Sequence, residues 1–247
     1  MNSEDAVRAT NVLLEAFDGL AQMGGIAVTA EHESAFQAVF GWWAWINRSG
    51  KLVLIAHDAE LGHESAPNVR SILEHTLVMQ WVADAGYDAL ETLTALDDDR
   101  RRKLFDDAVL ASWPLPEGLT RPEAEATKHR LRRKIENFAE LCRDYEGAGQ
   151  IYVAYRLLST YVHPTAKGAE AFVRADWDLT AYPVNESDTY LFQTAICLIQ
   201  AARTINTFLR NQDLTRAIEA AQEHLGGTVP RPTWKQSANP KDEASAE

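Results

Sequence analysis

The chain has 247 residues, and its 24 Lys and Arg residues against 36 Asp and Glu residues give a formal net charge of −12. This acidic balance excludes a general nucleic-acid coat protein, because binding to phosphates depends on clustered basic residues, but it leaves room for a small basic site. Two cysteines, Cys142 and Cys197, are too few for a disulfide-rich secreted scaffold or for a zinc cage made of thiolates. A chain of this length can bury a large core without crosslinks.

The N-terminal residues are acidic and polar, and they lack the basic and apolar regions of a signal peptide. The longest apolar stretches fall short of the roughly 20 residues that a membrane span needs. These features predict a cytoplasmic protein with reduced cysteines and no membrane partner.

Apolar residues repeat with the period of an α-helix along the first third of the chain. A first helix carries an apolar stripe from Val12 to Leu20 and ends before the Gly24-Gly25 pair. A second helix begins near Thr29 or Glu31. Within it, Ser49-Gly50 is either a mild interruption or a break, and the sequence leaves both alternatives open.

Pro67 suits the first turn of a third helix over about 68–85, and Gly86 ends that helix. The same period predicts further helices over about 87–112, 121–146, 149–163 and 187–224. No segment alternates apolar and polar residues as a half-buried strand does.

Two segments are not expected to be helical. The stretch 164–186 is longer than most connections in compact domains, and such loops are often functional. Residues 225–247 contain few apolar side chains, which predicts a disordered tail. The sequence therefore predicts an all-α fold, with a single multi-helix bundle over 1–224, a long loop near 164–186 and a disordered C-terminal tail.

The helix expected over 149–163 is almost wholly apolar and aromatic, which is typical of a helix that is buried or lies at an interface. Arg156 and His163 are seven residues apart, close to two full turns, so they share one face, with Ser159 between them. Pro164 disfavours helical backbone at His163, which is therefore expected to end the helix.

A second polar pair lies in the helix over 68–85, where Arg70 and Glu74 are spaced i, i+4 and can pair. A buried carboxylate needs a cationic or hydrogen-bonding partner, which either Arg70 or Arg156 could supply to Glu74. We therefore expect one polar cluster inside the apolar bundle, made of Arg70, Glu74, Arg156, Ser159 and His163.

The spacing Arg156-x6-His163 resembles the R-x(4–6)-H motif of the HEPN superfamily, all-helical proteins of prokaryotic toxins, phage-defence systems and RNA processing. The patterns R-x-x-x-E (Arg70, Glu74) and S-x-x-x-H-P (Ser159, His163) are similar to a group of bacterial helical proteins with no assigned activity, over roughly residues 30–210. The sequence departs from many active HEPN members in having Leu157, an apolar residue, directly after the arginine.

The HEPN resemblance implies a homodimer that brings two such motifs together across its twofold axis. It also implies a metal-independent endoribonuclease that needs no cofactor. His163 would be the acid and base that handles the ribose 2′-hydroxyl or the leaving oxygen, and Arg156 would hold the phosphate in the transition state.

Two functions are consistent with these features. One is an endoribonuclease of a toxin or phage-defence type, with RNA as substrate and an antitoxin or another protein as partner. The alternative, which Leu157 and the acidic balance favour, is a non-catalytic helical module that binds a protein partner or a small ligand. The one strongly basic run is either a solvated helix face or an RNA contact, through Lys128, Arg130, Arg132, Arg133 and Lys134.

The acidic, His-rich stretch from His57 to His75 raises the question of a metal site. A carboxylate–His site in a helix bundle uses Glu-x-x-His pairs from two helices, and this stretch supplies one, Glu60 with His63. A solvated turn between helices fits its charge density better, so no metal site is expected.

Overall fold

The computed structural model describes residues 2–22, 26–122, 131–173, 180, 182–183 and 188–235. Within these ranges the fold is all-α, as the sequence predicts. The α-helices are α1 (Ser3–Gln22), α2 (Glu33–Asp58), α3 (Ala66–Ala85), α4 (Tyr87–Leu110), α5 (Arg132–Glu136), α6 (Phe138–Arg143), α7 (Gly149–Val162), α8 (Ala166–Glu170), α9 (Thr189–Phe208) and α10 (Thr215–His224). Two 3-10 helices, Ala30–His32 and His63–Ser65, and two short strands, β1 (Tyr145–Glu146) and β2 (Thr233–Trp234), complete the described part.

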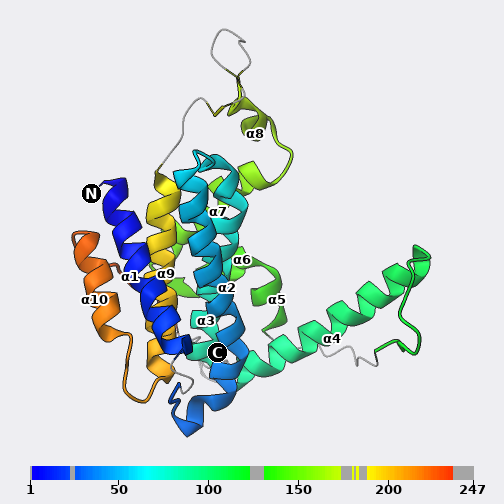
Figure 1. Cartoon of the computed structure of the whole chain (residues 1–247). Helices are drawn as coiled ribbons and strands as arrows, with labels where there is room; N and C mark the ends of the chain where they lie inside the picture. Colours follow the sequence, from blue (N-terminus) through cyan, green and yellow to red (C-terminus); the bar gives the residue numbers. More distant parts are fainter. Residues whose placement is uncertain are drawn as a thin grey trace, which may run out of the picture.

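The core lies in a bundle in which α9 is central (Figure 1). Helix α9 packs against α1, α2, α3 and α10, and α7 packs against the side of α3. Apolar side chains such as Leu191, Leu198 and Ile205 are buried around α9 because it is surrounded by other helices. Among the described helices, none is both long enough and apolar enough to span a membrane.

Helix α2 runs without a break through Ser49 and Gly50, which resolves the two alternatives left by the sequence. Both residues are buried. A Cβ atom added at Gly50 would lie 3.2 Å from Cδ1 of Leu198 on α9. The glycine therefore permits a close approach of α2 to α9 rather than ending the helix.

The helix predicted over 187–224 is wrong, because the structure divides this segment into α9 and α10. Gln212 adopts a left-handed conformation with φ 51°, which turns the chain. Asn206 holds the turn, since its Oδ1 accepts a hydrogen bond from the Leu214 amide at 3.0 Å and its Nδ2 donates to Thr215 Oγ1 at 3.0 Å.

The single helix predicted over 121–146 is also wrong within the described residues, which form two short helices, α5 and α6, and a strand there. Asn137 separates the helices with extended backbone, and its side chain accepts a hydrogen bond from the Ala139 amide at 3.1 Å. An asparagine cap thus starts a new helix where the apolar period continues. Residues 123–130 of this segment lie outside the described residues.

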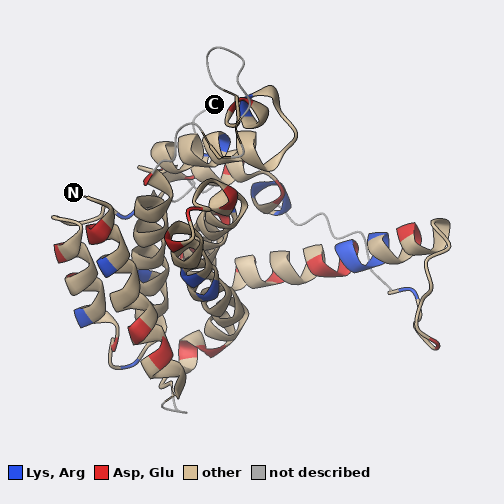
Figure 2. Ribbon diagram, turned by 45° about the horizontal axis from the view of Figure 1, so that its top comes forward, with Lys and Arg blue, Asp and Glu red and all other residues tan. Residues whose placement is uncertain are grey.

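Helix α4 extends away from the bundle as an arm (Figure 1). Its first half packs on α3 and α2, whereas Leu104, Leu110 and Trp113 at its outer end are largely exposed. Figure 2 shows acidic and basic stretches following one another along this arm. The outer part of the arm does not take part in the core, whereas Ala89 near the start of α4 is buried in it.

The predicted tail begins too early. Residues 225–235 are packed against the bundle: Val229 is buried, Gln80 Nε2 donates a hydrogen bond to the Pro232 carbonyl at 2.6 Å, and β2 pairs antiparallel with β1. The ordered domain therefore extends beyond residue 224, because partners far away in the sequence satisfy the backbone of this segment. Residues 236–247 of the predicted tail lie outside the described residues.

The predicted loop over 164–186 contains the short helix α8. The Thr165 side chain begins this helix by accepting a hydrogen bond from the Gly168 amide at 3.0 Å. The rest of the described loop is not helical.

Candidate functional site

Helix α7 ends at Val162, and His163 follows it with extended backbone (φ −99°, ψ 152°), as Pro164 predicts. The His163 amide donates a hydrogen bond to the Ser159 carbonyl at 3.3 Å. The residue is exposed. Its imidazole is therefore presented to solvent at the C-terminal end of α7.

The apolar helix α7 is not buried all round. Among its residues only Leu158 is fully buried, while Val153 is 67% exposed and Leu157 is 48% exposed. Arg156 lies between them on the helix surface and is also exposed. We call Val153, Arg156 and Leu157, with His163 at the end of the helix, the exposed α7 face. This face has the composition of an interface, because large apolar side chains surround one cation.

Among the described residues, Arg156 makes one polar contact, a hydrogen bond of 3.4 Å from its Nη1 to the Tyr152 hydroxyl. That bond raises the pKa of Arg156, so the guanidinium stays charged. Within the described part of the chain, no carboxylate lies within ion-pair distance of Arg156. Its remaining donors are free to bind an anion, and a guanidinium matches the geometry of a phosphate.

Arg156 and His163 are not in contact with each other. Two turns of helix separate them by about 10 Å along the axis. Both residues are exposed, Arg156 on α7 and His163 directly after its last residue.

The predicted polar cluster is wrong in its membership. Arg70 Nη2 donates a hydrogen bond to the Tyr155 hydroxyl at 2.8 Å and lies 3.7 Å from Glu74 Oε1, and the Arg70 guanidinium lies 4.7 Å from the Tyr155 ring centroid. Ser159 Oγ donates to the Tyr155 carbonyl at 2.7 Å, within its own helix. Tyr155, which the sequence analysis overlooked, is thus the centre of this contact, while Arg156 and His163 lie outside it.

Arg156 lies outside this contact because of the rotation of α7 about its own axis. Successive residues on a helix project about 100° apart, so a helix that turns Tyr155 toward α3 turns Arg156 away from it. The sequence shows that the helix is apolar but does not show which of its sides meets α3.

A family comparison covers this region. Residues 36–178 match the model of a family of unknown function (DUF5677). The chain belongs to the DUF5677 family. No curated protein and no solved structure matches it. The matched residues include Arg70, Glu74, Arg156, Ser159 and His163, and thus all of the paired motifs on α3 and α7.

In this DUF5677 protein, the basic run of the sequence is only partly available for a ligand. Arg132 Nη2 lies 2.5 Å from Asp99 Oδ2 and 2.9 Å from Glu136 Oε1. Hydrogen bonds from three basic side chains, with Arg132 among them, hold the pKa of Asp99 well below its ordinary value. Arg132 therefore connects α5 to the arm α4 through an ion pair, and its guanidinium is already occupied by carboxylates. Lys128 and Arg130 lie outside the described residues.

The other two residues of the run differ from each other. Lys134 forms an ion pair with Asp144. The side chain of Arg133 is 81% exposed and lies at 3.5 Å from Glu140, a long contact that solvent weakens. Arg133 is the described residue of the run best placed to meet a nucleic acid.

Two of the three histidines in the acidic stretch, His63 and His75, pack on aromatic rings. His75 stacks on Trp45 with centroids 4.6 Å apart, and His63 meets the edges of Tyr161 and Phe172 at 4.9 and 5.6 Å. Within the described ranges, no group of three or more His, Cys, Asp and Glu residues could hold a metal ion.

Four glutamines that were not predicted as site residues line a cavity beside another side of α7. Gln193 and Gln200 are seven residues apart on a largely apolar stretch of α9, with Cys197 between them. Amides repeated on an apolar stripe are the signal that could have identified this cavity, since buried amides need partners.

Proposed function

We propose that this DUF5677 protein is a metal-independent endoribonuclease whose exposed α7 faces pair in a homodimer. The observation that carries the proposal is the accessibility of Arg156 and His163 on one apolar helix, with Arg156 free of any carboxylate partner in the described residues. The similarity to the R-x(4–6)-H motif supports it.

The chemistry requires an acid–base group and a cation, and no metal. His163 would take the proton of a ribose 2′-hydroxyl while that oxygen forms a bond to phosphorus. The bond from phosphorus to the 5′-oxygen breaks, and the 5′-oxygen leaves as a hydroxyl after taking a proton from the protonated His163 of the second copy in the dimer, which gives a 2′,3′-cyclic phosphate. Arg156 would neutralise the charge that accumulates on the non-bridging oxygens.

A dimer explains two features of the exposed α7 face. Val153 and Leu157 would be removed from solvent, which favours association. Pairing around a twofold axis would also place the arginine of one copy near the histidine of the other, which relieves their separation within one protomer. The site would then be complete only in the dimer.

The test is cleavage of a mixed-sequence RNA by the purified full chain in the presence of EDTA. His163→Ala and Arg156→Ala should each reduce the rate by about 100-fold or more. Lys167→Ala is the matched control, since Lys167 is exposed on α8 and pairs only with Glu170 among the described residues. Cleavage by His163→Ala at the wild-type rate, or loss of wild-type cleavage in EDTA, would contradict the proposal.

The dimer is tested separately by light scattering during size-exclusion chromatography. Leu157→Glu should give monomers and abolish cleavage, because it places a charge in the middle of the proposed interface. A Leu157→Glu protein that cleaves RNA as a monomer would refute the requirement for a dimer.

The cellular setting that we propose is a cytoplasmic toxin or phage-defence protein, whose antitoxin or other protein partner would cover the exposed α7 face. Expression of the wild-type chain should then slow bacterial growth, and His163→Ala should relieve this effect. Equal slowing by both proteins would exclude RNA cleavage as the cause.

A second candidate function is a non-catalytic helical module that binds a small ligand. The observation that favours it is the cavity lined by the glutamines of α3, α7 and α9. In this case Arg156→Ala and His163→Ala would leave every measured property of the protein unchanged except its surface charge.

A further inference from the structure

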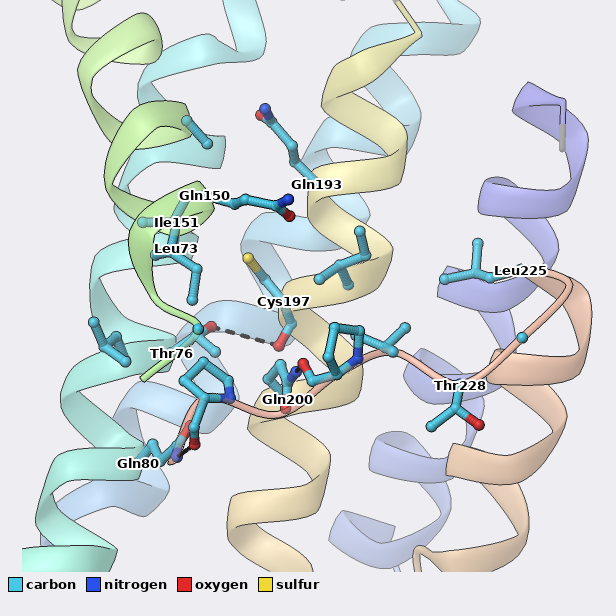
Figure 3. A pocket seen from close by; sticks show the side chains of 18 of the residues that line it. Leu73, Thr76, Gln80, Gln150, Ile151, Gln193, Cys197, Gln200, Leu225 and Thr228 are labelled. Atoms are coloured by element: carbon cyan, nitrogen blue, oxygen red, sulfur yellow. Dashed lines mark hydrogen bonds between the residues drawn. The ribbon is translucent and has the colours of Figure 1, made fainter. Parts of the chain in front are cut away.

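A cavity of about 430 Å³ lies between α3, α7, α9 and the segment Leu225–Pro232, which we call the strap (Figure 3). Its volume is within the range of about 300–1,000 Å³ that is typical of small-molecule sites. Among the described residues, the lining is apolar apart from Thr76, Thr228, Cys197 and four glutamines, and none of its side chains is charged. A charged ligand would therefore lose its hydration without gaining an ion pair.

The strap is fixed in place by side chains of the bundle. Gln200 Nε2 donates a hydrogen bond to the Pro230 carbonyl at 2.5 Å, and Arg203 Nη1 donates to the Val229 carbonyl at 2.6 Å. With the bond from Gln80 to the strap, two of the four glutamines are used to build the wall of the cavity. The cavity is therefore preformed, which reduces the entropic cost of binding.

Gln193, unlike Gln80 and Gln200, does not hold the strap. Its Oε1 atom is buried, and no donor of the described residues reaches it. Figure 3 shows Gln193 at one end of the cavity, close to Gln150 from α7. Buried amide oxygens are nearly always hydrogen-bonded in folded proteins, so an unpaired one that lines a cavity indicates a ligand donor.

The cysteine of the cavity does not suit covalent chemistry. Burial raises the pKa of the Cys197 thiol to about 12, so the sulfur is protonated at neutral pH and is a poor nucleophile. Like Leu73 and Ile151, Cys197 contributes apolar surface. Binding in this cavity is therefore non-covalent.

We propose that the cavity binds a neutral, mainly apolar small molecule that carries one N–H or O–H group, which donates a hydrogen bond to Gln193 Oε1. Because the described lining residues include no charged side chain, the cavity offers no ion pair to a nucleotide or another phosphate. The site is independent of the endoribonuclease proposal, because none of its residues belongs to the exposed α7 face.

The test uses two probes of the same shape on the full chain. N-phenyl-1-naphthylamine is neutral and apolar with one N–H group, and 1-phenoxynaphthalene replaces that group by an ether oxygen. Titration followed by fluorescence should show one saturable site for the amine on each chain. Gln193→Leu should weaken binding of the amine by about three- to tenfold, the effect of one hydrogen bond. The same substitution should not weaken binding of the ether.

The location is tested by filling the cavity. Ile196 lines it and is 40% exposed, so Ile196→Trp can be accommodated at the rim while it blocks the space. Ile55→Trp is the matched control, because Ile55 is 55% exposed on α2 and lies outside the cavity. The amine should bind to the Ile55→Trp protein and not to the Ile196→Trp protein.

Thermal melting shows whether each variant is folded, and Ala154→Leu fills the same space from α7 if Ile196→Trp does not fold. Equal binding to the filled and control variants would overturn the site. Equal loss of amine and ether affinity in Gln193→Leu would overturn the role of the amide oxygen. Absence of amine binding to the wild-type chain would overturn the whole proposal, whatever the result of the RNA assay.

Discussion

Two arginines on neighbouring helices, Arg70 and Arg156, should respond in opposite ways to truncation. The Arg70 side chain is 19% exposed, and its guanidinium donates to the Tyr155 hydroxyl at 2.8 Å, lies 4.7 Å from the Tyr155 ring centroid and is 3.7 Å from Glu74. A hydrogen bond contributes about 1 kcal/mol, a cation–π contact about 0.5–2 kcal/mol, and a partly exposed ion pair less than about 1 kcal/mol. Arg70→Ala should therefore destabilise the protein by about 2–3 kcal/mol.

Arg156→Ala should change the free energy of unfolding by no more than about 0.5 kcal/mol, as is usual for an exposed position. The one bond that it removes is long, at 3.4 Å, and lies on the surface. If the endoribonuclease proposal holds, this substitution abolishes activity with an unchanged fold, while Arg70→Ala reduces activity only through unfolding.

Urea denaturation followed by circular dichroism measures both changes. Tyr155→Phe, alone and combined with Arg70→Ala, completes a double-mutant cycle whose coupling energy should be about 1 kcal/mol. A loss of 2 kcal/mol or more in Arg156→Ala, on the scale of a buried interaction, would make Arg156 a structural residue and refute the division of roles between the two arginines.

Two further predictions concern the core. Gly50→Val should destabilise the protein by about 1–3 kcal/mol in thermal melting, because the new side chain overlaps Leu198, whereas Gly41→Val on the same helix should stay within about 0.5 kcal/mol, since nothing lies within 4 Å of a Cβ at that position. Burial raises the pKa of both Cys142 and Cys197 from 9.0 to about 12. Iodoacetamide at pH 8 should therefore modify both thiols about a thousandfold more slowly in the folded protein than in urea. Equal rates of modification, measured by mass spectrometry, would contradict the burial of the two cysteines.

Local rules were sufficient for several elements of the fold. Gly86 ends α3, and the dipeptide His163-Pro164 ends α7, because each feature restricts its own backbone. The break between α9 and α10 was missed because its turn depends on Asn206 hydrogen-bonding to residues after the turn, within a continuous apolar period. Asn206 and Gln212 are polar residues that can form such a turn, but the apolar period continues through this segment and favours one helix.

The strap could not be predicted, because its order comes from contacts distant in sequence. The Pro232 carbonyl is paired with Gln80, and no pattern near residue 232 indicates that partner. Composition alone made residues 225–235 resemble a disordered tail. The strap's share of the cavity wall was hidden from the sequence for the same reason, whereas the glutamines that α9 contributes left a signal in its apolar pattern.

The sequence selected Arg156 and His163 by their spacing, and the structure shows that both are exposed. Of the two partners that the sequence offered to Glu74, it is Arg70 that lies near this carboxylate. Arg156 does not, because Tyr155 occupies the side of α7 that faces Arg70. Amphipathic periodicity identifies the faces of a helix only when one of them is polar, and α7 is apolar on nearly every side.

The three sides of α7 allow the two proposals to be tested without interference. Ala154 faces the cavity, Tyr155 faces α3, and Arg156 faces solvent, since about 100° separates each residue from the next. A substitution on the first side should change ligand binding alone, and one on the third should change RNA cleavage alone. Tyr155→Phe is different, because it loosens the contact that sets the position of α7 on α3, and both measurements should then decline together.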